Sequence, residues 1–190
     1  RWSVKNSQGG QVTNRIFGTA QLNYEYNDNL TFTYRYGLDW YNERNTSYSN
    51  KDGVNFNEAI FGYLNSWDNN VSVSTHYASV NGNYDLSDEI GMSFVVGATS
   101  QNRSYDREGV ANTGQIVFGV LQSFNFENQT PISYHGSQNT VGVFASTDLD
   151  YNDYLFVSLS ARNDWVSNLP TENNSMLYPS MSVSFLPTAA

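Results

Sequence analysis

The sequence has no cysteine in its 190 residues, and it has only two histidines, His76 and His135. Disulfide bonds, thiolate catalysis and cysteine-ligated zinc sites are therefore excluded together. No run of about 18 consecutive apolar residues occurs, which excludes a membrane-spanning helix. Lys and Arg number 9 against 18 Asp and Glu, and this acidic balance argues against nucleic acid as a partner, because phosphate binding needs a basic face.

Side-chain patterns for catalysis or metal binding are equally scarce. The two histidines lie far apart in the sequence and support neither a zinc site nor a Ser–His–Asp arrangement. Residues 148–153 resemble the start of a calcium loop, but the required Gly and the distal Glu are missing. We therefore expect no catalytic residue, no metal and no cofactor. No charged-then-apolar segment opens the chain, so we expect either a removed signal peptide or an internal piece of a longer protein.

The clearest pattern in the sequence is a long hairpin over residues 138–165. Apolar side chains alternate with polar or charged ones on both sides of a turn at Asn152-Asp153. The apolar positions are Val141, Val143, Ala145, Thr147, Leu149 and Tyr151 before the turn, and Leu155, Val157, Leu159 and Ala161 after it. Arms of about a dozen residues extend about 40 Å, and about 9 to 11 tilted residues are enough to cross a bilayer. The pattern indicates a hairpin of a transmembrane β-barrel, whose alternation also explains a mean hydropathy of −0.51.

The same pattern recurs along the chain and predicts seven antiparallel strands connected as a meander. The expected strands are 12–26, 30–40, 71–84, 90–101, 138–151, 154–165 and 177–185. The expected tight turns between them are 27–29, 85–89 and 152–153. The expected loops are 1–11, 45–70, 104–137 and 166–176. Within the connection 104–137, the apolar patch 116–126 is open between a strand, a short hairpin and a helix-like insert. Single-chain bacterial barrels have even strand numbers, so either an eighth strand lies in 1–11 or 104–137, or the chain is part of a larger barrel of about 22 strands.

Tight and long connections alternate strictly, which places all tight turns at one rim and all long loops at the other. Bacterial outer-membrane barrels have short periplasmic turns and long extracellular loops. We therefore expect the tyrosines beside the tight turns to form the periplasmic aromatic girdle; they are Tyr24, Tyr26, Tyr84 and Tyr151.

The C-terminal part resembles a known family. The stretch Arg162-Asn163-Asp164-Trp165 is followed by Leu169-Pro170, by Asn173, Asn174 and Ser175, and then by Tyr178-Pro179-Ser180 and Val183-Ser184-Phe185. This order resembles the signature of SusC/RagA-type TonB-dependent transporters, outer-membrane nutrient importers of Bacteroidota. The resemblance covers about residues 138–190, whereas 12–137 carries no sharp motif.

The resemblance implies an all-β, 22-strand barrel filled by an N-terminal plug, capped by a SusD-like surface lipoprotein and energised through TonB. It implies import of an oligosaccharide or a peptide, contact with membrane lipid and lipopolysaccharide, and no enzymatic activity. No plug, TonB box or closing strand can be identified, so residues 1–190 are expected to be a piece of the barrel wall.

Several residues are candidates for function. Phe56, Tyr63 and Trp67 are expected to contact substrate or the lid lipoprotein, with packing inside their own loop as the alternative. The motif residues are expected to be structural, with an Arg162–Asp164 ion pair and Trp165 as an aromatic anchor; the others are Asn163, Leu169, Pro170, Tyr178 and Pro179. Arg15, Arg35 and Asp39 are expected to face the lumen, where they hold the plug or line water.

Two other functions remain open from the residues. One is a complete outer-membrane barrel of about eight strands with a structural or adhesive role. The other is a soluble β-sandwich that binds carbohydrate. The identity of the substrate and of the lid partner is not encoded in any motif.

Overall fold

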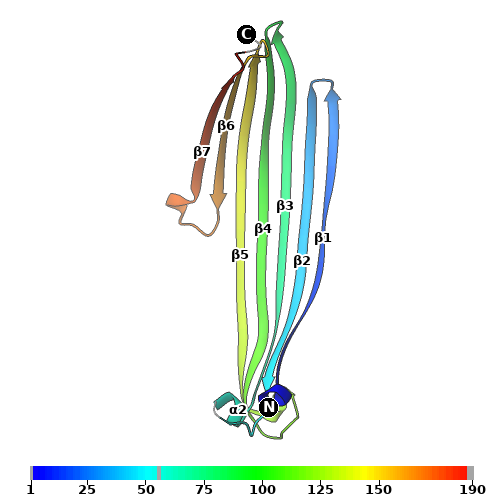
Figure 1. Cartoon of the computed structure of the whole chain (residues 1–190), viewed down its shortest axis with the longest axis vertical. Helices are drawn as coiled ribbons and strands as arrows, with labels where there is room; N and C mark the ends of the chain where they lie inside the picture. Colours follow the sequence, from blue (N-terminus) through cyan, green and yellow to red (C-terminus); the bar gives the residue numbers. More distant parts are fainter. Residues whose placement is uncertain (1, 55–56, 188–190) are drawn as a thin grey trace. The chain divides into compact units, whose positions relative to one another are not determined.

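The computed structural model describes residues 2–54 and 57–187 and consists mainly of one antiparallel sheet. Its seven strands lie side by side in sequence order (Figure 1). The elements are α1 (Trp2–Asn6), β1 (Ser7–Asn27), β2 (Leu30–Ser49), α2 (Asn57–Phe61), β3 (Tyr63–Ser87), β4 (Ile90–Gln115), the 3₁₀ helix η1 (Ser123–Asn125), β5 (Phe126–Tyr151), β6 (Leu155–Val166), the 3₁₀ helix η2 (Thr171–Asn173) and β7 (Ser175–Phe185). No helix among the described residues has the length and apolar character needed to cross a membrane.

The chain divides into two compact units that each contain parts of several strands. Residues 17–38, 73–103 and 138–190 form the first, called the turn unit here because it contains the tight turns. Residues 1–16, 39–72 and 104–137 form the second, called the loop unit because it contains the connections after β2 and β4.

The turn between β5 and β6 is set by its local sequence. Asn152 and Asp153 have φ angles of 49° and 60°, and a two-residue type I′ hairpin needs positive φ at both central positions. Asn and Asp tolerate this conformation better than other residues with a side chain. The Tyr154 backbone N–H donates to the Tyr151 carbonyl over 3.2 Å and closes the turn.

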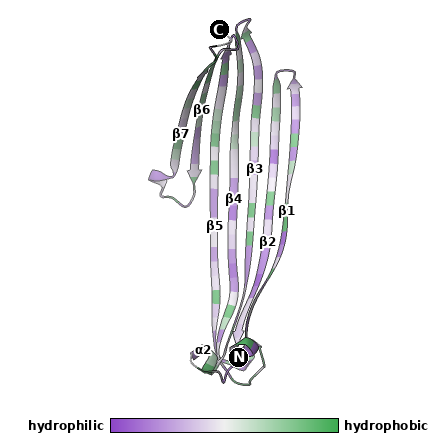
Figure 2. Cartoon of the chain, in the orientation of Figure 1, coloured by the Kyte–Doolittle hydropathy of each residue, from purple (hydrophilic) through white to green (hydrophobic). Residues whose placement is uncertain are grey.

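The register of β5, β6 and β7 gives the turn unit one apolar and one polar face. Leu149 is paired with Val157, which is paired with Val183, and these side chains share the apolar face. One position away, Asp148 is paired with Ser158, whose hydroxyl donates to its carboxylate over 2.5 Å. Hydrophobic and hydrophilic positions follow one another along the strands in Figure 2. The predicted faces of the hairpin are therefore confirmed.

Within residues 2–54 and 57–187, no protein layer lies over the apolar face of the turn unit. Leu159, Val183 and Met181 are 42%, 58% and 68% exposed, whereas the buried hydrophobic residues among those described, Leu64, Val71 and Phe126, all lie in the loop unit. A β-sandwich would bury this face against a second sheet. The sandwich alternative therefore does not describe this chain.

Several predicted boundaries are wrong because the strands continue into segments expected to be loops. The loop expected at 45–70 is reduced to 50–62, since β2 runs to Ser49 and β3 begins at Tyr63. The connection expected at 104–137 is reduced to 116–125, since β4 runs to Gln115 and β5 begins at Phe126. Polar contacts such as Asn42 Nδ2 to Asn70 Oδ1, at 2.9 Å, join these extensions, so the sequence there shows no apolar alternation.

The remaining uncertain segments contain no eighth strand among the residues that the structure covers. A loop was expected over residues 1–11, but residues 2–11 form α1 and the start of β1. The apolar patch 116–126 forms neither a strand nor a hairpin of its own: it consists of turns and the single-turn helix η1 before β5 begins.

Buried amide side chains tie the two long connections of the loop unit together. Gln115 Nε2 donates to Asn50 Oδ1 over 3.0 Å, and Gln115 Oε1 accepts the Lys51 backbone N–H over 2.8 Å. Asn50 Oδ1 also accepts the Gly119 backbone N–H over 3.1 Å, and Asn125 Oδ1 accepts a further backbone N–H of the same connection. Buried polar groups that are satisfied in this way fix the loop backbone.

Candidate functional site

A row of stacked side chains crosses the polar face of the turn unit. The Arg35 guanidinium lies 5.5 Å from the Tyr77 ring centroid, and the Tyr77 and Phe144 rings stack at 5.7 Å with an interplanar angle of 28°. The Arg162 guanidinium lies 5.9 Å from the Phe144 centroid on β5. We call Arg35, Tyr77, Phe144 and Arg162 the arginine–aromatic belt. Cation–π contacts at this range are attractive, so the belt links β2, β3, β5 and β6 through side chains as well as backbone.

Glycine on β4 and β5 allows the belt to lie flat on the sheet. A Cβ at Gly97 would lie 2.5 Å from Phe144 Cζ and 2.6 Å from the Ala78 carbonyl oxygen, so any larger residue clashes with ring and backbone. A Cβ at Gly142 would lie 2.5 Å from Arg162 Nη2. Glycine in a strand interior weakens the strand and often marks a close approach, which is its role here.

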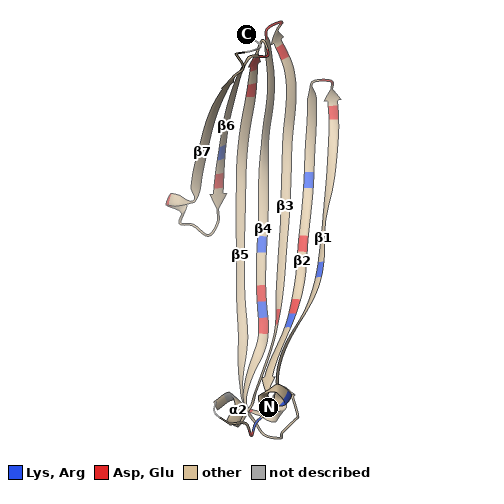
Figure 3. Cartoon of the chain, in the orientation of Figure 1, with Lys and Arg blue, Asp and Glu red and all other residues tan. Residues whose placement is uncertain are grey.

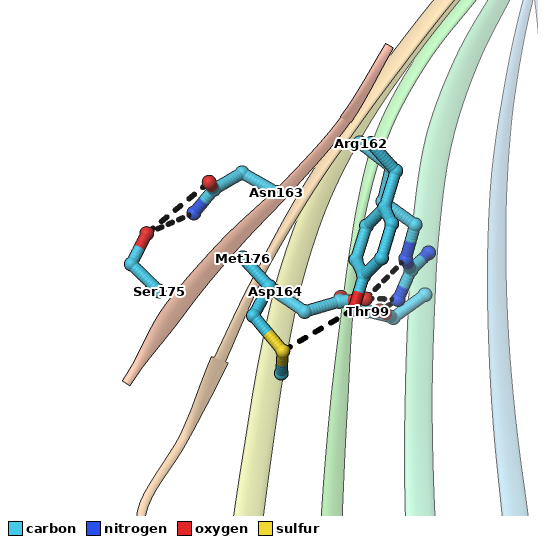
Figure 4. A network of polar contacts seen from close by, with 7 residues as sticks. Thr99, Arg162, Asn163, Asp164, Ser175 and Met176 are labelled. Atoms are coloured by element: carbon cyan, nitrogen blue, oxygen red, sulfur yellow. Dashed lines mark hydrogen bonds and ion pairs between the residues drawn. The ribbon is translucent and has the colours of Figure 1, made fainter. Parts of the chain in front are cut away.

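Arg162 is held in place by two neighbours on the polar face (Figure 4). Its Nε donates to Asp164 Oδ2 over 2.9 Å, and its Nη2 lies 2.7 Å from Asp164 Oδ1. Nη2 also donates to Thr99 Oγ1 on β4 over 2.9 Å. The side chains of Arg162 and Asp164 are 39% and 18% exposed. A two-atom contact of this kind fixes the guanidinium in one orientation.

The alternate residues of the same motif point to the apolar face. Asn163 Nδ2 donates to Ser175 Oγ over 2.9 Å on β7, and Ser175 Oγ lies 3.2 Å from Asn163 Oδ1. Trp165 is paired with Ser175 in the sheet and is 40% exposed. The role of Trp165 as an aromatic anchor for the following loop stays a prediction.

The rest of the motif shapes the connection to β7 and its first turns. The Leu169 backbone N–H donates to the Val166 carbonyl over 3.3 Å, and the Pro170 carbonyl accepts from the Asn173 N–H over 2.8 Å at the start of η2. In β7, Tyr178 is opposite Arg162 on the polar face and Pro179 is opposite Ala161 on the apolar face. Their structural role stays a prediction.

A second polar cluster lies in the loop unit around Asn69, which is 6% exposed. Its Oδ1 accepts from Tyr105 Oη over 3.0 Å and from Arg107 Nε over 2.8 Å, and its Nδ2 donates to Glu43 Oε2 over 3.0 Å. The Tyr105 ring meets the Tyr134 ring edge-on, with centroids 5.6 Å apart. We call Glu43, Asn69, Tyr105, Arg107 and Tyr134 the Asn69 cluster.

The predicted substrate- or lid-contact residues lie partly beside this cluster. Trp67 is two positions from Asn69 in β3 and therefore lies on the same side of the strand. It packs closely over Gly109, where an added Cβ would lie only 2.5 Å from Trp67 Cβ. Tyr63 Oη accepts from Ser47 Oγ over 3.4 Å. Both aromatics are therefore held on a strand, not on the loop that was expected. Phe56 lies outside the described residues.

The residues expected to face the lumen also have polar partners. Arg15 contacts both carboxylate oxygens of Asp39, with Nε to Oδ1 at 2.8 Å and Nη2 to Oδ2 at 2.6 Å, in the loop unit. In the turn unit, Arg35 Nε donates to Gln21 Oε1 over 2.9 Å. Charged side chains of this kind suit a water-filled interior. Their predicted contact with a plug remains a prediction.

The histidines lie in different units and share no site. His76 Nδ1 lies 2.8 Å from Tyr34 Oη in the turn unit, and His135 contacts the Asp106 carboxylate in the loop unit. Within residues 2–54 and 57–187, no group of three or more His, Cys, Asp or Glu side chains is arranged to hold a metal ion.

The belt was missed from the sequence because it depends on contacts between distant strands. Phe144 falls on the polar face of the predicted hairpin, but its contact with Tyr77 needs the register across β4. An aromatic residue on a polar face, combined with a glycine on a neighbouring strand, is the signal that could have revealed it.

These features define a class of protein: an antiparallel barrel wall with an uncovered apolar face and a polar face crossed by ion pairs. Residues 2–190 match the family model described as TonB dependent receptor-like, beta-barrel, so the chain belongs to that family of outer-membrane barrels. This membership confirms the predicted fold and the resemblance to TonB-dependent transporters, and it agrees with the expectation that the chain is not an enzyme. No curated protein matches the chain.

Solved structures show the same fold at low sequence identity. The RagAB peptide transporter matches with a TM-score of 0.86 over 96% of this chain, at 13% identity. The RagAB peptide importer matches in its open-open state with a TM-score of 0.86 over 96% of this chain. In its closed-closed state it matches with a TM-score of 0.85 over 95% of this chain, and both matches have 13% identity. The chain spans about a fifth of the length of these proteins, 20–21%.

Proposed function

We propose that this chain is part of the barrel wall of a TonB-dependent importer that carries an oligosaccharide or peptide across the outer membrane. One observation carries the proposal: the turn unit has an apolar face that no protein layer covers, directly behind a polar face that holds the Arg162–Asp164 ion pair. In a bilayer, the first face contacts acyl chains and the second faces an aqueous interior. Family membership gives this wall its place in a receptor barrel.

The two units support an orientation for the importer. The tight turns after β1, β3 and β5 lie in the turn unit, and short turns are periplasmic in bacterial barrels. The loop unit carries ion pairs and amide contacts, among them Arg44–Asp68 at 3.5 Å and the pair His135–Asp106. Charged groups are disfavoured against lipid, so we place this unit outside the cell surface.

In this orientation, Trp67 and the Asn69 cluster are the proposed contact surface for the imported molecule or for a SusD-like lid lipoprotein. Aromatic faces held on a rigid strand beside an amide and a guanidinium can stack on and hydrogen-bond to sugars or peptides. The RagAB structures are of a peptide transporter, so a peptide is one of the two substrate classes to test. TonB would engage the importer through another part of the protein.

Single cysteines test the orientation, because this chain contributes no cysteine of its own. In the full-length protein in intact cells, a membrane-impermeant maleimide should label Phe118→Cys in the loop 116–125. It should label Asp28→Cys in a tight turn only after the outer membrane is opened, and it should leave Leu159→Cys unlabelled in both conditions. Labelling of Asp28→Cys in intact cells, or recovery of the protein in the soluble fraction, would overturn the proposal.

Uptake tests the import function separately. Cells that lack the gene should lose uptake of one labelled class, oligosaccharide or peptide, and cells that lack TonB should lose the same uptake. Trp67→Ala in the full-length protein should weaken uptake without changing the labelling of Phe118→Cys. Normal uptake of both classes without the gene would contradict import while leaving the barrel placement intact.

A further inference from the structure

The apolar face of the turn unit is recessed in one place. A groove of about 860 Å³ crosses β4 to β7 there; its lining is mainly apolar and includes Ser146, Thr147, Ser160 and Ser180. Ala145 is paired with Ala161, which is paired with Pro179, so three adjacent strands present short side chains in one row. Leu159 and Met181, paired in the next row, are longer and form a rim. The row of short side chains therefore leaves a space that this chain does not fill.

A cavity with the opposite character lies at the tight turns of the same unit. It measures about 530 Å³ and no Lys or Arg lines it. Its acidic residues Asp85, Asp88, Glu89 and Asp153 lie at the turns, whereas Asp150 is on the polar face of β5, two positions from Asp148. Figure 3 shows acidic but no basic positions at this end of β3 and β5. Along β4, Ile90 of the cavity is two positions from Met92 of the groove. A molecule with a cationic head and an apolar tail could therefore occupy both.

We propose that the groove binds an acyl chain of phosphatidylethanolamine from the membrane leaflet nearest the tight turns, with the ammonium group directed at the acidic cavity. The groove is continuous with the face that contacts lipid, and from Met92 to Val96 it extends about 13 Å along β4. A flexible chain fills a recess that side chains leave open and gains the packing contacts that an empty recess lacks. An anionic phospholipid would bring a net negative charge to the carboxylates and is disfavoured.

This inference goes beyond import and depends only on the membrane placement of the barrel. The test uses the full-length protein extracted in mild detergent, offered phosphatidylethanolamine or phosphatidylglycerol, with retained lipid measured by native mass spectrometry. The wild-type protein should retain phosphatidylethanolamine preferentially. The double variant Ala145→Leu/Ala161→Phe fills the groove and should lose the retained lipid, whereas Val183→Phe, on the same face outside the groove lining, should keep it.

A second variant tests the head-group contact. Asp88→Asn/Asp153→Asn should keep a bound lipid but lose the preference for phosphatidylethanolamine, and Asn tolerates the positive φ of 60° at position 153. Equal retention by the groove-filled variant and by Val183→Phe would overturn the inference, as would equal retention of the two lipids by the wild type. A dimer cross-linked through Leu159→Cys would also overturn it, because a second copy would then cover the groove.

Folding is checked by heat-modifiable migration on gels. If the filled variant does not fold, a photoreactive phosphatidylethanolamine added to the wild-type protein still decides the question. Cross-links should map to the peptide that contains Leu159, and cross-links spread evenly around the apolar face would show bulk lipid alone. Uptake measured in the same cells separates the import proposal from the lipid proposal. A groove-filled variant that loses the retained lipid but keeps normal uptake bears only on the lipid proposal.

Discussion

A pair of neighbouring arginine substitutions tests the two faces of β6 most directly. Leu159 is on the apolar face, paired with Thr147 and Met181, and Ser160 is on the polar face, paired with Ser146 and Ser180. Both side chains are exposed and they differ by one position in the same strand. Leu159→Arg and Ser160→Arg add the same charge at nearly the same height but on opposite sides of the wall.

The expected magnitudes follow from the position of Leu159 in the strand. It lies four residues beyond Leu155, the first residue of β6, or about 13 Å along the strand and about 9 Å in height at a tilt of about 45°. In an apolar band about 25 Å tall this is close to the midplane, where Arg on the lipid face costs about 2–4 kcal/mol. The folding equilibrium of Leu159→Arg should therefore fall by roughly 30- to 700-fold. Ser160→Arg, in contact with water, should stay within about 0.5 kcal/mol of the wild type.

The assay is reversible folding of the full-length barrel into lipid vesicles, followed by denaturant titration of each variant. The free energy of unfolding should separate the two substitutions by at least about 1.5 kcal/mol, using the figures above. Leu159→Lys, which carries the same charge on another side chain, should follow Leu159→Arg. Equal losses for the two positions, or a larger loss for Ser160→Arg, would refute the assignment of the faces.

Three further predictions concern Gly97, the Arg162–Asp164 pair and Trp67. Gly97→Ala should destabilise the barrel by about 1–3 kcal/mol, because the added methyl group overpacks against the Phe144 ring and the Ala78 backbone. The control Gly18→Ala should cost little, since no heavy atom lies within 4 Å of its added Cβ. Both free energies are measured by denaturant unfolding. A double-mutant cycle of Arg162→Gln and Asp164→Asn should show a coupling energy of about 0.5–3 kcal/mol, and additivity would contradict the ion pair. Trp67→Ala should raise the half-saturating substrate concentration for uptake about fivefold or more. This is the loss of substrate affinity expected when an aromatic contact worth about 1 kcal/mol is removed. An unchanged half-saturating concentration would remove Trp67 from the contact surface.

Local patterns were enough to predict the turn unit. Apolar alternation on both sides of Asn152-Asp153 fixes which residues of β5 and β6 share a face, because a one-residue slip would send every apolar side chain to the polar side. The Arg162 and Asp164 side chains, two positions apart, were expected to pair on the same reasoning, and they are in contact.

The loop unit was harder to predict because few apolar side chains alternate along residues 104–115 and 126–137. Residues 104–115 and 126–137 form strands whose side chains meet in polar pairs, such as His135 with Asp106 and Tyr105 with Tyr134. With few apolar side chains the alternation of period two is weak, and stretches rich in Asn, Ser and Tyr resemble loops. The backbone ladder holds these strands together, and its register cannot be read from one segment alone.

The stretch Arg162-Asn163-Asp164-Trp165 links β6 to strands on both sides of it. Arg162 bonds to Asp164 and to Thr99 on β4, while Asn163 bonds to Ser175 on β7. Three consecutive residues thus make side-chain contacts on both faces of the sheet and reach strands on both sides of β6. Replacing any one of the polar members leaves a partner without its hydrogen bond in a wall that has little dry core to compensate. We therefore expect the motif to specify the register of the wall, whereas substrate contact is proposed for Trp67 in the other unit.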